Sequence, residues 1–182
     1  MKQKVLLLAV LMIGGLCFLS CGQRPQGEYE KKIVGKWHFG HSQKLEEGLT
    51  MAFEFTTDYR ADKTAIYEGF IRLRVEVEDE DYANNLTFEY SISGESTWDV
   101  EGDYFIEKGN RCDIELKKAS AMVEMEDNDF YIEMIKEKLE DFIPELRSSL
   151  LKKSKDKIIK LNDTEFSIED EDGETETYTR IE

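Results

Sequence analysis

The stretch that decides the fold is residues 67–78, which read Tyr-Glu-Gly-Phe-Ile-Arg-Leu-Arg-Val-Glu-Val-Glu. From Ile71 to Val77 every odd position is apolar, and the even positions carry charges. Successive side chains of a strand point to opposite faces of a sheet. A run with this period therefore predicts a long strand with one buried face and one wet face.

The same alternation recurs in most of the chain. Turn-forming pairs such as Gly102-Asp103 and Gly109-Asn110 separate the alternating runs and favour tight hairpins. Short connections favour antiparallel neighbours, so we predict a mainly β fold, an antiparallel meander barrel of about eight to ten strands. The apolar parity shifts near Ala119, where we expect a β-bulge. The expected strands are residues 33–39, 49–58, 64–78, 85–95, 96–101, 103–108, 111–125, 156–161, 164–170 and 174–181.

Residues 129–153 follow a different pattern. Apolar side chains recur there at spacings of three and four, from Ile132 to Leu150, which predicts one amphipathic helix before the last three strands. Pro144 lies inside this segment, so we expect a kink or two short helices.

The N-terminus is typical of an export signal. Lys2 and Lys4 precede an apolar run of about 15 residues, which is shorter than the roughly 20 residues of a spanning helix. The run ends in Phe18-Leu-Ser-Cys21, which resembles a bacterial lipobox. This resemblance implies a signal peptide at residues 1–20, lipidation of Cys21, and an exported protein anchored to the outer membrane, on a face that the sequence leaves open. The alternative is an ordinary secretory signal with an incidental cysteine.

Residues 21–32 are polar, contain Pro and Gly, and are predicted to form a tether to a folded domain of residues 33–182. After cleavage and lipidation only Cys112 would stay free, so no intrachain disulfide is expected. Its place on the apolar side of an alternating run favours a buried core residue.

Three segments carry a family resemblance. They are Gly35-Lys-Trp37, the stretch Thr-Trp98-Asp-Val-Glu-Gly102-Asp103, and the C-terminal strands with Arg180. Together they resemble the lipocalin-like (calycin superfamily) domains of bacterial lipoproteins, whose motif positions correspond to Gly35, Trp37, Trp98, Gly102 and Asp103. The resemblance implies that Arg180 stacks on Trp37 and closes one barrel end, a contact worth about 0.5–2 kcal/mol. The helix departs from the family, because about three strands follow it here.

The predicted inner face is rich in aromatic residues. One interpretation is an apolar pocket in which tyrosine hydroxyls orient a ligand, and the other is an ordinary packed core. The candidate lining residues are Phe53, Phe55, Tyr67, Phe88, Tyr90, Trp98, Tyr104 and Phe166.

Charge and missing motifs exclude several function classes. The chain has 40 acidic and 24 basic residues and a net charge of −16, which argues against nucleic-acid binding. We find no nucleophile elbow, zinc-protease or Walker motif, so no catalytic residue, cofactor or enzymatic activity is predicted. His38 and His41 would face opposite sides of a strand, so no metal site is predicted.

Two charge runs have alternative interpretations. The acidic run at residues 78–81 reads as a solvated hairpin tip rather than a Ca²⁺ site. The basic run at residues 147–160 would suit anionic head groups, or a helix C-terminus followed by a wet strand edge.

The sequence thus predicts a non-catalytic binding module for a small apolar ligand, held at the membrane through Cys21. The alternative is a structural or protein-interaction lipoprotein with a filled core and no small-molecule ligand. A third hypothesis, a hydrolase or lyase, requires a cluster of buried titratable residues that no motif indicates. Protein partners stay unassigned.

Overall fold

The computed structural model describes residues 26–79 and 82–181, and this part of the chain is mainly β with two helices. The class predicted from the alternation is confirmed. In chain order the elements are α2 (Gln26–Ile33), β1 (Gly35–Glu46), β2 (Leu49–Tyr59), β3 (Thr64–Asp79), β4 (Tyr82–Glu101), β5 (Tyr104–Ala121), α3 (Asn128–Leu150), β6 (Lys153–Leu161), β7 (Glu165–Glu169) and β8 (Thr175–Arg180).

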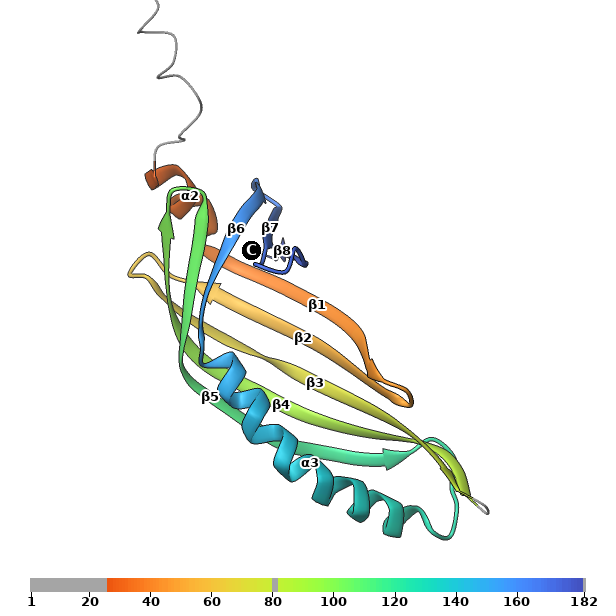
Figure 1. The fold of residues 1–182 in the computed structure, drawn as a ribbon. Helices are drawn as coiled ribbons and strands as arrows, with labels where there is room; N and C mark the ends of the chain where they lie inside the picture. Colours follow the sequence, from red (N-terminus) through yellow and green to blue (C-terminus); the bar gives the residue numbers. More distant parts are fainter. Residues whose placement is uncertain (1–25, 80–81, 182) are drawn as a thin grey trace, which may run out of the picture.

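The eight strands form one antiparallel meander that closes into a ring (Figure 1). Closure is complete at one end only. β6 pairs with β5 along residues 104–108, and β8 meets β1 only at Trp37↔Arg180 and His38↔Thr179. Beyond this closed end the long strands β1 to β5 continue as a curved sheet, because β6, β7 and β8 have only 9, 5 and 6 residues.

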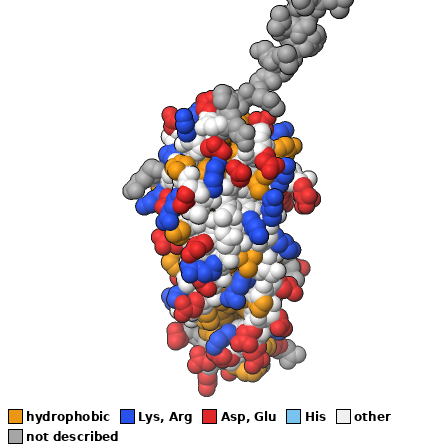
Figure 2. Space-filling view, turned by 90° about the vertical axis from the view of Figure 1, so that its left-hand side faces the viewer, with side chains coloured by type: hydrophobic (Ala, Val, Ile, Leu, Met, Phe, Trp, Pro, Cys, Tyr) orange, Lys and Arg blue, Asp and Glu red, His pale blue; other side chains and the backbone are white. Residues whose placement is uncertain are grey.

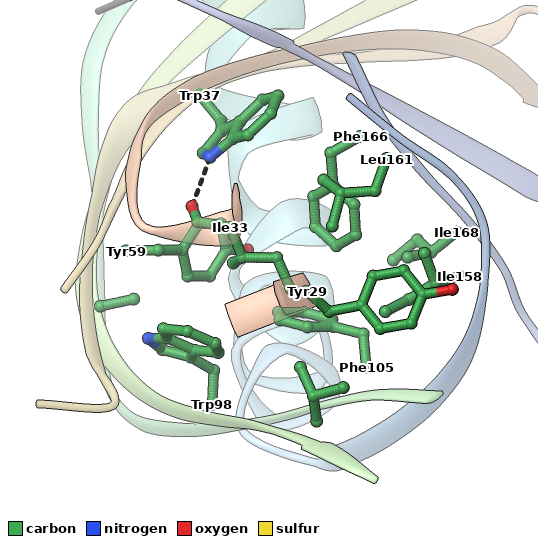
Figure 3. Close-up of a cluster of buried hydrophobic side chains, with 12 residues drawn as sticks. Tyr29, Ile33, Trp37, Tyr59, Trp98, Phe105, Ile158, Leu161, Phe166 and Ile168 are labelled. Atoms are coloured by element: carbon green, nitrogen blue, oxygen red, sulfur yellow. Dashed lines mark hydrogen bonds between the residues drawn. The ribbon is translucent and has the colours of Figure 1, made fainter. Parts of the chain in front are cut away.

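The closed end is filled by one group of buried side chains, here called the end cluster (Figure 3). Rings meet edge to face within it, as Tyr59 and Phe105 do at a centroid distance of 5.6 Å. Aromatic pairs of this geometry add about 0.5–1.5 kcal/mol to area burial. The end cluster consists of Tyr29, Ile33, Trp37, Tyr59, Ala65, Trp98, Val100, Phe105, Ile158, Leu161, Phe166 and Ile168.

Trp37 and Arg180 lie together in this end, with the guanidinium carbon 4.2 Å from the indole centroid. Both side chains also bind the last turn of α2. Trp37 Nε1 donates to the carbonyl of Ile33 at 2.7 Å, and Arg180 donates to the carbonyls of Lys32 and Val34. The final carbonyls of a helix have no partner inside it. The pair therefore caps α2 as well as closing the ring.

Helix α2 changes the expected domain boundary. Residues 21–32 were predicted to be a tether and residues 33–39 the first strand, whereas α2 begins at Gln26 and β1 at Gly35. Tyr29 and Ile33 are buried inside the ring, so this segment belongs to the folded domain. Gly35 has a φ of 137° where α2 turns into β1, a conformation that glycine adopts readily. The predicted signal peptide and Cys21 lie outside the described residues.

The predicted helix at residues 129–153 is α3, and it precedes the last three strands as expected. It runs unbroken through Pro144, so the expectation of two short helices is wrong. Its buried residues Ile135 and Leu139 pack on β2 to β5 and form what is here called the helix-side cluster. That cluster also contains Met51, Ile71, Leu73, Leu86, Phe88, Tyr90, Ile92 and Cys112.

Of two turns expected from the sequence, one is present and the other is not. Gly102 has a φ of 64° in the turn between β4 and β5, as a tight hairpin requires. The predicted break at Gly109-Asn110 is wrong, because β5 runs through it with a register shift that leaves Asn110 unpaired. Two predicted strand pairs thus merge into β4 and β5. A second shift leaves Lys117 unpaired, close to the bulge predicted from the change of parity.

Candidate functional site

Between the end cluster and the helix-side cluster lies a cavity of about 370 Å³. Small-molecule sites usually measure about 300–1,000 Å³. One side of the cavity is formed by Tyr59 and Ile168 of the end cluster, and another by Leu150 near the end of α3. The lining residues are Phe39, Phe55, Thr57, Tyr59, Tyr67, Ser96, Glu107, Gly109, Ser149, Leu150, Lys152, Ser154, Asp156, Ile168, Asp170, Glu176 and Tyr178.

The inner face of β4 explains why the interior is open at this level. Val100 and Trp98 are large and belong to the end cluster, and Ile92 belongs to the helix-side cluster. Between them lie Ser96, whose small side chain lines the cavity, and Gly94, whose lack of a side chain leaves room for the ring of Tyr67. Other strands also contribute small or polar residues to the lining: Thr57, Glu107, Gly109, Ser154 and Asp156.

Aromatic rings form a continuous wall of the cavity. Phe39 lies 5.1 Å from Tyr178 and 6.3 Å from Phe55, and Phe55 lies 6.5 Å from Tyr67, measured between ring centroids. Such rings supply apolar contact area, and their faces attract cations.

Two glycines shape the cavity by allowing close approach. A Cβ at Gly94 would lie 2.2 Å from the hydroxyl oxygen of Tyr67, so only glycine leaves room for that ring. The Tyr67 hydroxyl donates to the carbonyl of Arg111 at 3.1 Å, and burial raises the Tyr67 pKa. A Cβ at Gly109 would lie 2.3 Å from the carbonyl oxygen of Leu150. Gly109 thus lets the end of α3 cover this side of the cavity.

Glu107 is a desolvated carboxyl group in the lining. Its carboxylate accepts hydrogen bonds from the hydroxyls of Ser96 and Tyr59, the latter at 3.1 Å. Burial raises the Glu107 pKa, the charges of Glu176 and Asp156 raise it further, and the two hydrogen bonds oppose this. Burial, and next the charge of Glu107, raise the Tyr59 pKa well above 10.0.

Three further carboxyl groups line the cavity. Burial raises the Asp156 pKa, and the charge of Asp170 adds to this. Desolvation raises the Glu176 pKa, as do the charges of Asp156 and Asp170. The Tyr178 hydroxyl, which donates to Glu176 at 2.7 Å, partly offsets the shift. Carboxylates that raise one another's pKa create a region of negative potential.

The predicted lining residues fall into four groups. Phe55 and Tyr67 line the cavity. Phe88 and Tyr90 are buried in the helix-side cluster, and Phe53 packs against it. Trp98 and Phe166 belong to the end cluster.

Tyr104 is a correction, because it is 42% exposed and lies under Lys155 on the outer face. Phe105 takes the inward position, since Phe105 pairs with the inward Val100. The motif residue Asp103 accepts a hydrogen bond from Tyr29 at 3.2 Å, which ties α2 to the β4–β5 turn.

Sequence reasoning missed the carboxylates. Glu107 follows Phe105 by two positions, and Glu176 precedes Tyr178 and Arg180 by two and four. In the structure this parity places both on the inner face. The expectation that Tyr104 points inward placed Glu107 on the outer face, so parity gives the inward position of Glu107 only with the register that turns Phe105 inward.

The remaining motif residues do not assemble into a metal or thiol site. Among the described residues no three His, Cys, Asp or Glu side chains converge as metal ligands. His41 stacks on Phe39 at 6.2 Å, whereas His38 lines a shallow outer groove beside the exposed Phe70. Cys112 is buried in the helix-side cluster, and desolvation raises its pKa.

On the outer surface, basic and acidic side chains are interspersed over the face seen in Figure 2, and acidic ones gather at its lower end. Within the basic run, Lys155 pairs with Glu101 at 3.1 Å and Lys160 pairs with Glu165 at 2.8 Å. These pairs favour the interpretation of a wet strand edge. The acidic run at 78–81 includes residues 80 and 81, which lie outside the described part. No helix within that part is long and apolar enough to cross a membrane.

No protein-family model matches the chain, and no curated protein matches it.

Proposed function

We propose that this protein is a lipid-anchored lipoprotein of the bacterial cell envelope whose lipocalin-like barrel is a non-catalytic binding module for a small molecule. The observation that carries the proposal is the cavity of about 370 Å³ between two packed clusters. A ring that served only as a scaffold would gain stability by filling this space, because interiors pack without voids larger than a water molecule.

The chemistry of the lining supports a ligand with substantial apolar surface. Phe39, Phe55 and Tyr67 offer ring contacts, and the hydroxyls of Tyr59 and Tyr178 already have fixed partners in Glu107 and Glu176. Preformed contacts of this kind reduce the entropy lost on binding.

Native mass spectrometry of the full chain, purified from its host, tests the proposal. The expected result is an added small-molecule mass that is lost from Ser154→Trp, in which an indole from β6 fills the cavity. Lys157→Trp, on the outer face of the same strand, is the matched control and should keep the added mass. A protein mass without any addition, together with a crystal structure in which the cavity is closed, would refute it.

The anchor is tested separately by Cys21→Ser. We expect this variant in the soluble fraction and the native protein in the membrane fraction after a salt wash, because several acyl chains together hold a protein firmly at a bilayer. A Cys21→Ser variant that stays with the membrane would overturn the anchor.

The filled-core alternative is favoured by the five predicted lining residues that pack in the two clusters instead of the cavity. On that view the outer faces bind a protein partner. Crosslinking in intact cells separates the two, because a binding module for small molecules needs no constant protein neighbour.

One observation favours the third hypothesis, a hydrolase or lyase. Glu107 and Asp156 are desolvated carboxyl groups with raised pKa, as a general acid requires. An enzyme would convert the bound compound, so the native mass spectra would then show a product whose mass differs from that of the compound.

A further inference from the structure

The charge of the cavity indicates which chemical class it takes. Four carboxyl groups line it, from β5, β6, β8 and the turn between β7 and β8, whereas Lys152 is the single basic lining residue. Among ion pairs between described residues, none involves Glu107, Asp156, Asp170 or Glu176. Carboxylates on the outer face of the strands do have basic partners, as Glu89 has in Arg72.

The lack of a basic partner is least favourable for the buried Glu107. Its hydrogen-bond partners are two neutral hydroxyls, and no cation offsets its charge within the described structure. Burying an ionised carboxylate without a partner of opposite charge is unfavourable. A cation entering the cavity would supply the missing partner.

The aromatic wall selects the kind of cation. The rings of Phe39, Phe55, Tyr67 and Tyr178 offer π faces and apolar surface, which suit an organic ammonium group better than a hydrated inorganic ion. A bare metal ion would need convergent oxygen ligands, and the described residues provide no such cluster.

We propose that the cavity binds an organic ammonium cation with an apolar substituent, held between the aromatic wall and the carboxylates of Glu107 and Glu176. This inference rests on the proposed binding function and adds that the ligand carries a positive charge beside its apolar surface. The carboxylates attract the ammonium group, and the rings contact the substituent.

Isothermal titration calorimetry with two probes of similar shape tests the charge. The full chain in non-ionic detergent is titrated at pH 7 with 4-phenylbutylamine and with 4-phenylbutan-1-ol. Salt near 0.15 M screens attraction to the acidic outer surface. We expect the amine to bind at least tenfold more tightly than the alcohol.

Single substitutions test whether the carboxylates of the cavity cause the preference for the amine. Glu107→Gln should weaken amine binding about tenfold and leave alcohol binding within twofold, and Glu176→Gln should act in the same direction. Glu115→Gln is the matched control, because Glu115 is an exposed carboxylate of β5 paired with Lys117. It should change neither affinity. Ser154→Trp should abolish binding of both probes.

The outcomes separate the two proposals. Equal affinity for amine and alcohol, with both lost in Ser154→Trp, would overturn the cation inference and leave the binding function standing. Amine binding that survives in both Glu107→Gln and Ser154→Trp would mean that the cation binds elsewhere, and would also overturn it. If neither probe binds, the cation inference fails, and the binding function is then judged by the native mass spectra.

Discussion

The end cluster and the cavity beside it are built by the same strands, yet they follow opposite rules. On β4 the inner residues Val100 and Trp98 are almost fully buried against other rings, whereas Ser96, two residues before Trp98, lines the cavity with a small side chain. The closed end gathers apolar area, and the cavity gathers carboxylates whose burial is unfavourable. Sites of function often carry such a cost in stability. The difference teaches that the closed end supports the fold and that the cavity layer is the part available for binding.

Among the substitutions that test this comparison, Trp37→Ala should lower the free energy of unfolding most. The indole is fully buried in the end cluster and contacts Phe166 and Arg180. Replacing a buried Trp by Ala typically lowers the free energy of unfolding by about 3–5 kcal/mol, which urea denaturation measures. Trp37→Phe, the control, should lose less. A loss below about 1 kcal/mol, or lost ligand binding at an unchanged melting temperature, would contradict the structural role of Trp37.

Ile33→Ala tests whether α2 belongs to the end cluster. Ile33 is fully buried, so we expect the free energy of unfolding to fall by about 2–5 kcal/mol in the same urea experiment. Lys31→Ala, at an exposed position of the same helix, should stay within about 0.5 kcal/mol of the native protein. Equal effects of the two substitutions would mean that residues 26–33 act as a tether after all.

Arg180→Met should have a smaller effect at the same end. It removes the cation over Trp37 and the donors to the last carbonyls of α2, and we expect a loss of about 1–2 kcal/mol, measured by thermal and urea unfolding. Arg180→Lys keeps the charge without the planar fork, so it should fall between Met and the native protein. If the Lys variant matched the native protein, the hydrogen bonds to α2 would contribute nothing.

Glu107→Gln should have the smallest effect on stability, and the opposite sign. Its pKa in the folded protein is raised above 4.5, so the folded state favours the protonated carboxyl. The resulting stability is fully present below about pH 4.5 and is lost as pH rises through the raised pKa. The Gln variant, whose amide can bond both hydroxyls, should therefore equal the native protein near pH 4 and melt at a higher temperature near pH 8.

Glu115→Gln serves as the control for that pH series and should follow the native protein throughout. A Glu107→Gln variant that is less stable than the native protein at pH 8 would show that the carboxylate supports the fold. That result would remove the contrast between the end cluster and the cavity.

The periodicity of the sequence predicted most strands and helix α3. The predictions failed where a short segment or a single residue departs from that periodicity. Alternation located the strands, and the spacing of Ile132, Ile135 and Leu139 located α3. Helix α2 was missed because it is short, polar and next to Pro25, and among its side chains only Tyr29 and Ile33 are buried apolar groups of the end cluster. Gly109-Asn110 resembles a turn, but the tertiary pairing of β5 absorbs Asn110 as a bulge.

The candidate site was predictable in part. Phe55 and Tyr67 were expected in the lining, whereas the small and charged residues that create the cavity were not, since an empty space results from several strands at once. Thr57, Ser96 and Gly109 have no distinctive pattern in sequence and become meaningful only when the register places them in one layer.

The docking of α2 inside the closed end has a consequence for orientation at the membrane. On the proposal that Cys21 carries the acyl chains, five peptide units separate the anchor from Gln26, and a fully extended chain of that length reaches at most about 18 Å. The domain would stand on its closed end within a short distance of the lipid head groups, with α3 and the far tips of β3 and β4 directed toward the aqueous space (Figure 1). On the same proposal, an upright domain would present the closed end to the head groups and would leave the long strands β1 to β5 to extend away from the bilayer.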